Sequence, residues 1–170
     1  MIWLEELQNR KKISRIFNTY ASTFPENERR DEAQFLELAE NPNCYIYNIK
    51  KEENAIGYCI IWQLESCYFL EHFEVFEAFR NQKYGSEIVE ILKEKFEKLV
   101  LETEPEHLSE IAKRRISFYQ RNGFEIIEKK YLQPSYGEGK PKALLYLMSN
   151  FLPENLQILV EEIYLQVYEN

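Results

Sequence analysis

Apolar positions follow a helical period in two stretches near the start of the chain. The first stretch stops at Phe24-Pro25, because the residue before a proline is driven out of the helical conformation. The second runs from about 31 to 40 and ends before Asn41-Pro42. The pattern predicts two helices here, the first with its apolar face formed by Ile13, Ile16, Phe17, Tyr20 and Phe24.

The period then changes to that of β-strands. Segments 44–49 and 55–62 are rich in β-branched and aromatic residues, and the charged turn KKEEN separates them, which predicts an antiparallel hairpin. Segment 66–76, SCYFLEHFEVF, is a third strand candidate.

The second half of the chain alternates helices and strands. Helical periodicity returns over 84–99, LVLET at 99–103 is a short strand, and the next helix ends at Asn122-Gly123, a left-handed cap. Strands at 125–132 and 143–148 flank a loop rich in Pro and Gly at 134–142, and an amphipathic helix follows at about 153–168. This order predicts a single α/β domain over 1–170, with a mixed sheet and a core at about 13–148.

Composition narrows the function classes. The chain has 29 Asp and Glu against 21 Lys and Arg, a net charge of -8, which argues against a surface for nucleic acid. No apolar run approaches the roughly 18 residues of a membrane span, and the first residues lack a signal-peptide pattern. Cys44, Cys59 and Cys67 form no CxxC motif, so we expect reduced core thiols in a soluble, cytoplasmic protein.

Candidate chemistry gathers where the third strand gives way to the helix at 84–99. Gly85 lies at the start of the helix, with Arg80 and Lys83 just before it. The free N–H groups and positive dipole of a helix N-terminus can hold a phosphate, and Gly85 allows close backbone approach. The plainer alternative, equally compatible with these residues, is a tight turn relieved by glycine beside two solvated cations.

Two motifs resemble one family. RNQKYG at 80–85 resembles the R/Q-x-x-G-x-G/A signature of the GNAT superfamily of acyl-CoA-dependent N-acyltransferases. Downstream, RISFYQRNGF at 115–124 resembles the end of a helix that is typical of the family. The segments ISFYQRNGF and YLQPSYGEGKPKALLYLM also look like those of a bacterial branch of the superfamily. With the hairpin, the likeness covers about 13–148. It implies the GNAT fold, here with an additional C-terminal amphipathic helix, and acetyl-CoA as co-substrate without a metal.

The resemblance also implies roles for residues at the cofactor end. The main chain at Phe73 and Val75 pairs with pantetheine where this strand splays from LVLET, and Arg80 adds positive charge. Tyr119 faces the sulfur of CoA as a general acid, the alternative being a core tyrosine. The loop amides that hold the pyrophosphate belong to Gln82, Lys83, Tyr84, Gly85 and Ser86. Since Lys83 replaces the first glycine of the signature, we expect that the loop cannot use a glycine conformation there.

Glu71 is the candidate general base. Its surroundings, LEHFEVFEAFRNQKYGSEI, are similar to those of polyamine N-acetyltransferases, where a glutamate occupies this place. An amine with a pKa near 10.4 must lose a proton before it attacks, so a carboxylate or a water chain is needed. Glu71 is alternatively part of a charged strand face with Glu74 and Glu77. Because neighbours on a strand point to opposite sides, we do not expect Glu71 and His72 to act on one atom.

These observations predict an N-acetyltransferase that moves an acetyl group to a primary amine of a small molecule or peptide by direct attack. Tyr131 and Tyr136 are candidates for lining the substrate site. His107 has no further ligands at a metal spacing, so no metal is expected. The first alternative is an acyl-CoA-binding sensor or interaction module without turnover, and the second is a structural protein. The C-terminal helix either packs on the sheet's own face or forms a homodimer contact.

Overall fold

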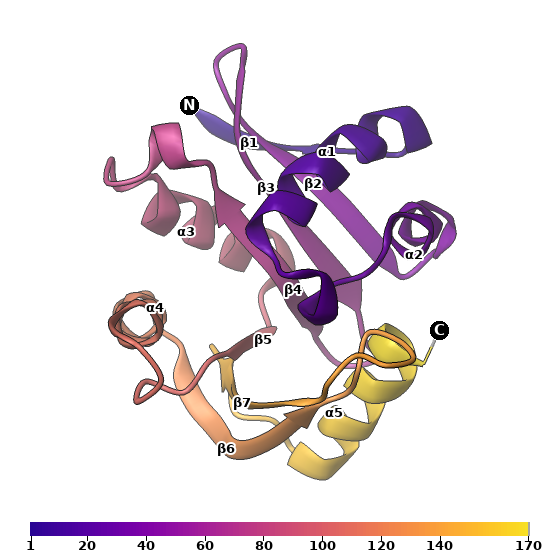
Figure 1. Ribbon diagram of the computed structural model, residues 1–170. Coiled ribbons are helices and arrows are strands. Elements are labelled where there is room, and N and C mark those ends of the chain that lie inside the picture. Colours follow the sequence, from indigo (N-terminus) through magenta and orange to yellow (C-terminus); the bar gives the residue numbers. More distant parts are fainter. Residues whose placement is uncertain (170) are drawn as a thin grey trace.

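The computed structural model describes residues 1–169. Its seven strands form one mixed sheet (Figure 1). The strands lie in the order β1-β2-β3-β4-β5-β7-β6. Their bounds are β1 Ile2–Glu6, β2 Cys44–Lys51, β3 Asn54–Gln63, β4 Tyr68–Val75, β5 Leu99–Thr103, β6 Glu125–Gln133 and β7 Ala143–Ser149. The helices are α1 Arg10–Thr23, α2 Glu32–Glu37, α3 Tyr84–Phe96, α4 Glu110–Arg121 and α5 Leu156–Ile163. The predicted α/β class and the order of elements from the first helix onward are confirmed, while Asn170 of the predicted domain lies outside the described residues.

The strand β1 was missed by the sequence analysis, and the core therefore begins earlier than residue 13. It pairs antiparallel with β2, from Ile2 opposite Lys51 to Glu6 opposite Tyr47. A strand of five residues is too short to show the alternation of apolar and polar positions clearly. It is held in the sheet by pairing with the edge of β2, a contact between segments distant in the sequence.

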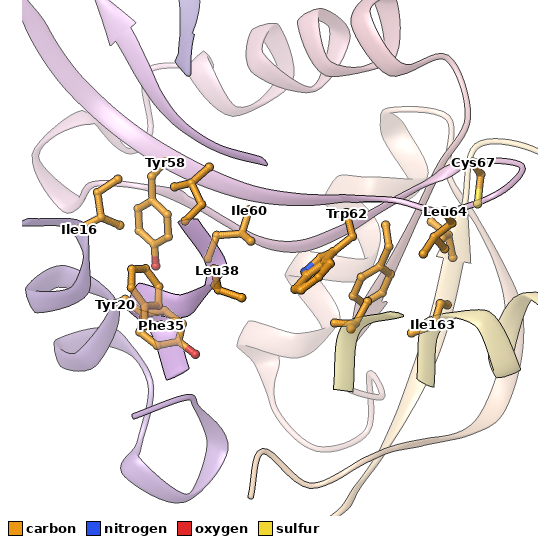
Figure 2. Close-up of a cluster of buried hydrophobic side chains, with 14 of the residues drawn as sticks. Ile16, Tyr20, Phe35, Leu38, Tyr58, Ile60, Trp62, Leu64, Cys67 and Ile163 are labelled. Carbon is orange, nitrogen blue, oxygen red and sulfur yellow. The ribbon is translucent and has the colours of Figure 1, made fainter. Parts of the chain in front are cut away.

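The two faces of the sheet carry separate cores. Helices α1, α2 and α5 cover one face and α3 and α4 the other (Figure 1). Figure 2 shows the first core, where Tyr20 and Phe35 lie below Tyr58 and where Trp62 and Ile163 are buried. Helix α5 continues as a π-helical turn, η4 Tyr164–Tyr168, and both pack into this core. The predicted C-terminal helix thus lies on the sheet's own face.

The sheet divides between β4 and β5, its parallel pair. Their pairing covers only three positions and ends where Leu70 lies opposite Leu101. Beyond this point β4 stays with β3, and β5 stays with β7. The two halves diverge from there, as expected for this pair, and open a cavity.

Each described helix is too short or too polar to cross a membrane.

Candidate functional site

A cavity of about 1510 Å³ occupies the divergence of β4 and β5. Its walls come from the end of α1, from β4 and β5, from the first turn of α3, and from α4 and β7. Several of the residues singled out in the sequence line it: Glu71, Phe73, Val75, Arg80, Lys83, Tyr84, Gly85, Ser86, Tyr119 and Tyr136.

A β-bulge at Glu71 shapes the inner end of this cavity. The register of β3 against β4 shifts so that Ile60 lies opposite His72 and Ile61 opposite Leu70, which leaves Glu71 as the extra residue. Glu71 and His72 consequently face the same side, with His72 Nε2 3.5 Å from Glu71 Oε1. The expectation that strand alternation separates these two side chains was wrong, because alternation fails at a bulge.

The Glu71 carboxylate is completely buried and well supplied with donors. Arg30 forms an ion pair with it, Trp62 Nε1 donates to Oε2 at 2.7 Å, and the Tyr136 hydroxyl donates to Oε1 at 3.1 Å. Burial alone would raise the pKa of Glu71, but the Arg30 guanidinium and the hydrogen bonds outweigh it and hold the pKa well below the ordinary value. Glu71 is therefore ionised at neutral pH.

Arg30 ties three segments to this carboxylate. Its backbone N–H donates to the Tyr20 hydroxyl at 2.8 Å, and its Nη2 donates to the carbonyl oxygen of Val167 at 2.9 Å. The guanidinium also lies 5.7 Å from the centroid of the Trp62 ring and 5.1 Å from that of Tyr136. The loop after α1 and the C-terminal turn η4 are thereby held against β4.

A second carboxylate, Glu102, was missed by the sequence analysis. It follows the last paired position of β5, as Glu71 does on β4, so the two acids stand side by side where the strands part. Glu102 accepts hydrogen bonds from Tyr131 Oη at 2.6 Å, Gln133 Nε2 at 2.6 Å and Tyr168 Oη at 2.8 Å. Burial nevertheless raises its pKa to about 7. An acid inside the apolar strand LVLET was the signal available in the sequence.

The opposite end of the cavity lies at the start of α3. Lys83 precedes this helix with φ 64° and ψ 4°, so it adopts the left-handed conformation that favours glycine. The expectation that a lysine prevents this conformation was wrong. The cavity here is lined by Tyr84, Gly85 and Ser86, residues of the first turn, whose N–H groups have no intrahelical acceptor. A Cβ on Gly85 would lie 3.3 Å from the Phe118 ring, so glycine lets α3 approach α4 closely.

Positive side chains surround that helix end. Arg80, Lys83, Arg115 and Arg121 all line the cavity. The Arg80 guanidinium also donates to the Val75 carbonyl at 2.8 Å and lies 3.3 Å from a Glu74 oxygen. Unpaired amides, a helix dipole and these cations suit a polyanion such as the pyrophosphate of CoA. Gln82, in contrast, turns its side chain back to the Ala78 carbonyl and does not line the cavity.

The tyrosines differ in their positions. Tyr119 lies on α4 between the rings of Phe118 and Phe124, and burial raises its pKa to about 12, so the phenol stays protonated. Tyr136 reaches the cavity and Glu71, whereas Tyr131 is 2% exposed and lies behind Glu102. Over residues 1–169, the structure has no cluster of three or more His, Cys, Asp or Glu side chains that could hold a metal ion.

Comparison with solved structures finds this architecture in known proteins. A candidate acetyltransferase of the GNAT family from Bacteroides thetaiotaomicron is 30% identical, with a TM-score of 0.89, and the match covers 100% of this chain and 99% of that one. The ribosomal-protein-S18-alanine N-acetyltransferase from Escherichia coli is 17% identical, with a TM-score of 0.63 and coverage of 92% and 99%. The spermidine/spermine N-acetyltransferase SpeG from Vibrio cholerae is 12% identical, with a TM-score of 0.61 and coverage of 88% and 93%. The last two share the fold.

Sequence comparisons complete the assignment. A search of curated proteins gave no significant match. The model of the acetyltransferase (GNAT) family matches residues 11–124, which include the loop before α3 and the helix that carries Tyr119. The chain therefore belongs to the GNAT family of acetyltransferases.

Proposed function

We propose that this protein transfers an acetyl group from acetyl-CoA to a primary amine by direct attack. The observation that carries the proposal is the pair of carboxylates, Glu71 and Glu102, at the inner end of a cavity whose outer end is a cationic helix N-terminus. A polyanion and an amine would thus meet at the divergence of β4 and β5.

Acetyl-CoA, when bound, supplies the acetyl group as a thioester and a thiolate as leaving group. The first turn of α3, with Lys83, Arg115 and Arg121, would hold its phosphates. The backbone of β4 would hold its arm: Phe76 N–H donates to the Ile56 carbonyl of β3, so the N–H groups of Phe73 and Val75 point away from β3 and toward the gap. The same N–H groups would stabilise an oxyanion.

The two carboxylates suit different tasks. An ionised Glu71 would attract an ammonium group to the extent that Arg30 leaves its charge unbalanced, but its low pKa makes it a weak proton acceptor. Glu102, with a pKa of about 7, is matched to accept a proton at neutral pH. We propose that Glu71 draws in the amine and that Glu102 takes its proton. The sequence-based hypothesis, Glu71 as the base through a water molecule, is the alternative.

Tyr119 is the proposed partner of the leaving thiolate. Its pKa of about 12 keeps the hydroxyl protonated and able to donate a hydrogen bond. An ordinary thiol has a pKa of about 8.5, so complete proton transfer from this phenol is uphill by roughly 5 kcal/mol. Tyr119 therefore stabilises the thiolate by hydrogen bonding, and any proton that it passes to the sulfur as the general acid is replaced from water as the product leaves.

Thermal unfolding tests cofactor binding. Acetyl-CoA at about 100 times its dissociation constant should stabilise the fold by about 2.7 kcal/mol. Thiol release with a panel of amines then tests transfer. A thermal shift without thiol release for any amine would favour the alternative of a non-catalytic acyl-CoA-binding module. The absence of a shift at millimolar acetyl-CoA would exclude both the transferase and the binding module.

The pH profile of kcat/KM separates the two candidate bases. We expect the native profile to rise through about pH 7, following Glu102. Glu102→Gln should abolish this rise. Glu71→Gln should raise the KM for the amine but leave the rise of kcat/KM through about pH 7 in place. The opposite pattern would return the base role to Glu71. Tyr119→Phe should lower kcat with little effect on acetyl-CoA affinity, and unchanged turnover would assign Tyr119 to packing.

A further inference from the structure

The C-terminal turn η4 is connected to both carboxylates of the site. The Val167 carbonyl oxygen accepts a hydrogen bond from Arg30, which is the ion-pair partner of Glu71. The hydroxyl of the next residue, Tyr168, donates to Glu102 and lies 2.8 Å from Oε1 and 2.9 Å from Oε2. Two neighbouring residues of one turn thus reach the two acids that stand where β4 and β5 part.

Tyr168 contacts Glu102 from outside the large cavity. Glu102 and Gln133 line that cavity, whereas Tyr168 lines a second cavity of about 130 Å³. The Tyr168 ring lies 5.4 Å from the ring of Tyr136, which lines both cavities. Tyr168 can therefore act on a molecule in the large cavity only through its neighbours, of which Glu102 is the acid.

The hydrogen bonds at Glu102 leave room for a substrate. Tyr131 Oη donates to Oε1 and Gln133 Nε2 donates to Oε2, both at 2.6 Å, and Tyr168 Oη bridges the two oxygens. Gln133 Nε2 also donates to Tyr168 Oη at 3.1 Å, so this hydroxyl accepts from the amide while it donates to the carboxylate. A carboxylate has about four lone pairs, so three donors leave about one position for a proton from an amine.

Burial and the surrounding groups act on Glu102 in opposite directions. Burial raises the pKa of Glu102 to about 7, the hydrogen bonds from β6 and η4 lower it, and the charge of Glu71 raises it. Arg30 pairs with Glu71. The side chains near Glu102 on the neighbouring elements are Glu71 on β4, Leu147 on β7, Tyr131 and Gln133 on β6, Tyr136 in the loop before β7, and Tyr164 and Tyr168 on η4. The hydrogen bonds thus oppose both burial and the second acid.

We propose that Tyr168 is a positioning residue for the base: from η4 it fixes the orientation of the Glu102 carboxylate and favours its ionised form. This inference rests on the proposed function, in which Glu102 takes the proton of the amine. The hydrogen bond from Arg30 to the Val167 carbonyl fixes the backbone next to Tyr168. The same turn thus holds both acids in place, Glu71 through Arg30 and Glu102 through Tyr168.

A titration of the carboxyl groups of the full chain tests this inference directly. NMR of the glutamate carboxyl carbons follows Glu102, whose signal is identified by its loss in Glu102→Gln. Tyr168→Phe keeps the ring beside Tyr136 and removes the hydroxyl. Because a hydrogen bond to a charged group stabilises that group, the pH at which Glu102 is half ionised should rise by about one unit. An unchanged midpoint in folded Tyr168→Phe would overturn the inference.

Tyr164→Phe is the matched control in the same turn. The Tyr164 hydroxyl donates to the Leu132 carbonyl at 2.6 Å. Its removal should leave the titration midpoint of Glu102 where it is in the native protein. A midpoint that moves equally in both variants would assign the effect to a loosened turn and would overturn the specific role of Tyr168.

The pH profile of kcat/KM connects the titration to the reaction. With the midpoint raised by about one unit, Tyr168→Phe should lower kcat/KM about fivefold at pH 7, and the loss should vanish toward about pH 9. A loss of the same size at every pH would indicate a structural defect and would overturn the inference. A midpoint that moves while the profile stays would keep Tyr168 as the residue that sets Glu102 and would remove Glu102 as the base, so the inference and the proposed base role fail separately.

Discussion

The Arg30→Met substitution removes the guanidinium that faces the buried Glu71 carboxylate while keeping an apolar stem of similar length. The carboxylate would then be buried without its counter-charge. Breaking a buried ion pair in this way costs about 3–5 kcal/mol of unfolding free energy. In a domain of this size, each kcal/mol lowers Tm by about 2–4 °C, so we expect Tm to fall by roughly 10 °C at pH 7.

The loss should depend on pH with a predictable sign. In the native protein the pKa of Glu71 is lowered, so its contribution to stability is present above the unfolded-state pKa of about 4.3 and is lost as the pH falls toward its folded value. Without Arg30, burial raises the pKa of Glu71 above 4.3, and the ionised group then destabilises the fold at neutral pH. Between this raised pKa and pH 4.3, each unit by which the pH is lowered should increase the free energy of unfolding of the variant by about 1.4 kcal/mol.

Thermal unfolding of both proteins between pH 5 and pH 8 measures this difference. Arg29→Met is the matched control, because Arg29 donates to the backbone carbonyls of Phe24 and Arg30 and contacts the Phe17 ring. The control should lose little stability, without a dependence on pH. A loss below about 1 kcal/mol for Arg30→Met, or the same loss at pH 5 and pH 8, would refute the ion-pair argument.

Three further substitutions test the backbone of the cavity. Gly57→Ala would place a Cβ 2.2 Å from the Glu74 carbonyl oxygen of β4, so thermal unfolding should show a loss of about 1–3 kcal/mol or more, and a neutral effect would contradict the packing of β3 on β4. Gly85→Ala should lower stability in thermal unfolding and weaken acetyl-CoA binding measured by calorimetry, because the new Cβ lies 3.3 Å from the Phe118 ring and would push the first turn of α3, the proposed phosphate cradle, away from α4; unchanged stability would contradict this close approach. In chemical denaturation, Lys83→Gly should be more stable than Lys83→Ala by about 1 kcal/mol, because alanine is strained in the left-handed conformation of residue 83 and glycine is not. Equal stabilities of the two variants would contradict this conformation.

Local signals were enough to predict the loop and the helix start at the proposed cofactor end. The helical period resumes at Tyr84, where α3 begins, and Gly85 lies in its first turn as expected. Capping and turn chemistry depend on neighbours in the sequence, so such features are visible without a fold. The conformation of Lys83 was mispredicted because propensity is a preference of about 1 kcal/mol, which the packing of α3 against α4 can override.

The inner end depends on contacts between distant segments. Arg30 is 41 residues from Glu71, and Tyr136 is 65 residues away. Nothing in the local pattern around Arg30 distinguishes it from an exposed loop cation. The role of Glu102 likewise required the register of β5 against β4, because only this register sets the two acids side by side.

The bulge in β4 nevertheless left a trace in the sequence. Strict alternation through FLEHFEV would place Phe69, Glu71 and Phe73 on one face, which mixes acid and apolar side chains. With one extra residue, Leu70 and Phe73 instead share the apolar face toward α3 and α4, and Glu71 and His72 both turn to the face covered by α1. The apolar spacing of three residues between Leu70 and Phe73 is thus the signature of the bulge. Because this single insertion separates the face that carries Glu71 from the face that carries Phe73, the proposed chemistry on both sides of the gap depends on the register of one strand pair.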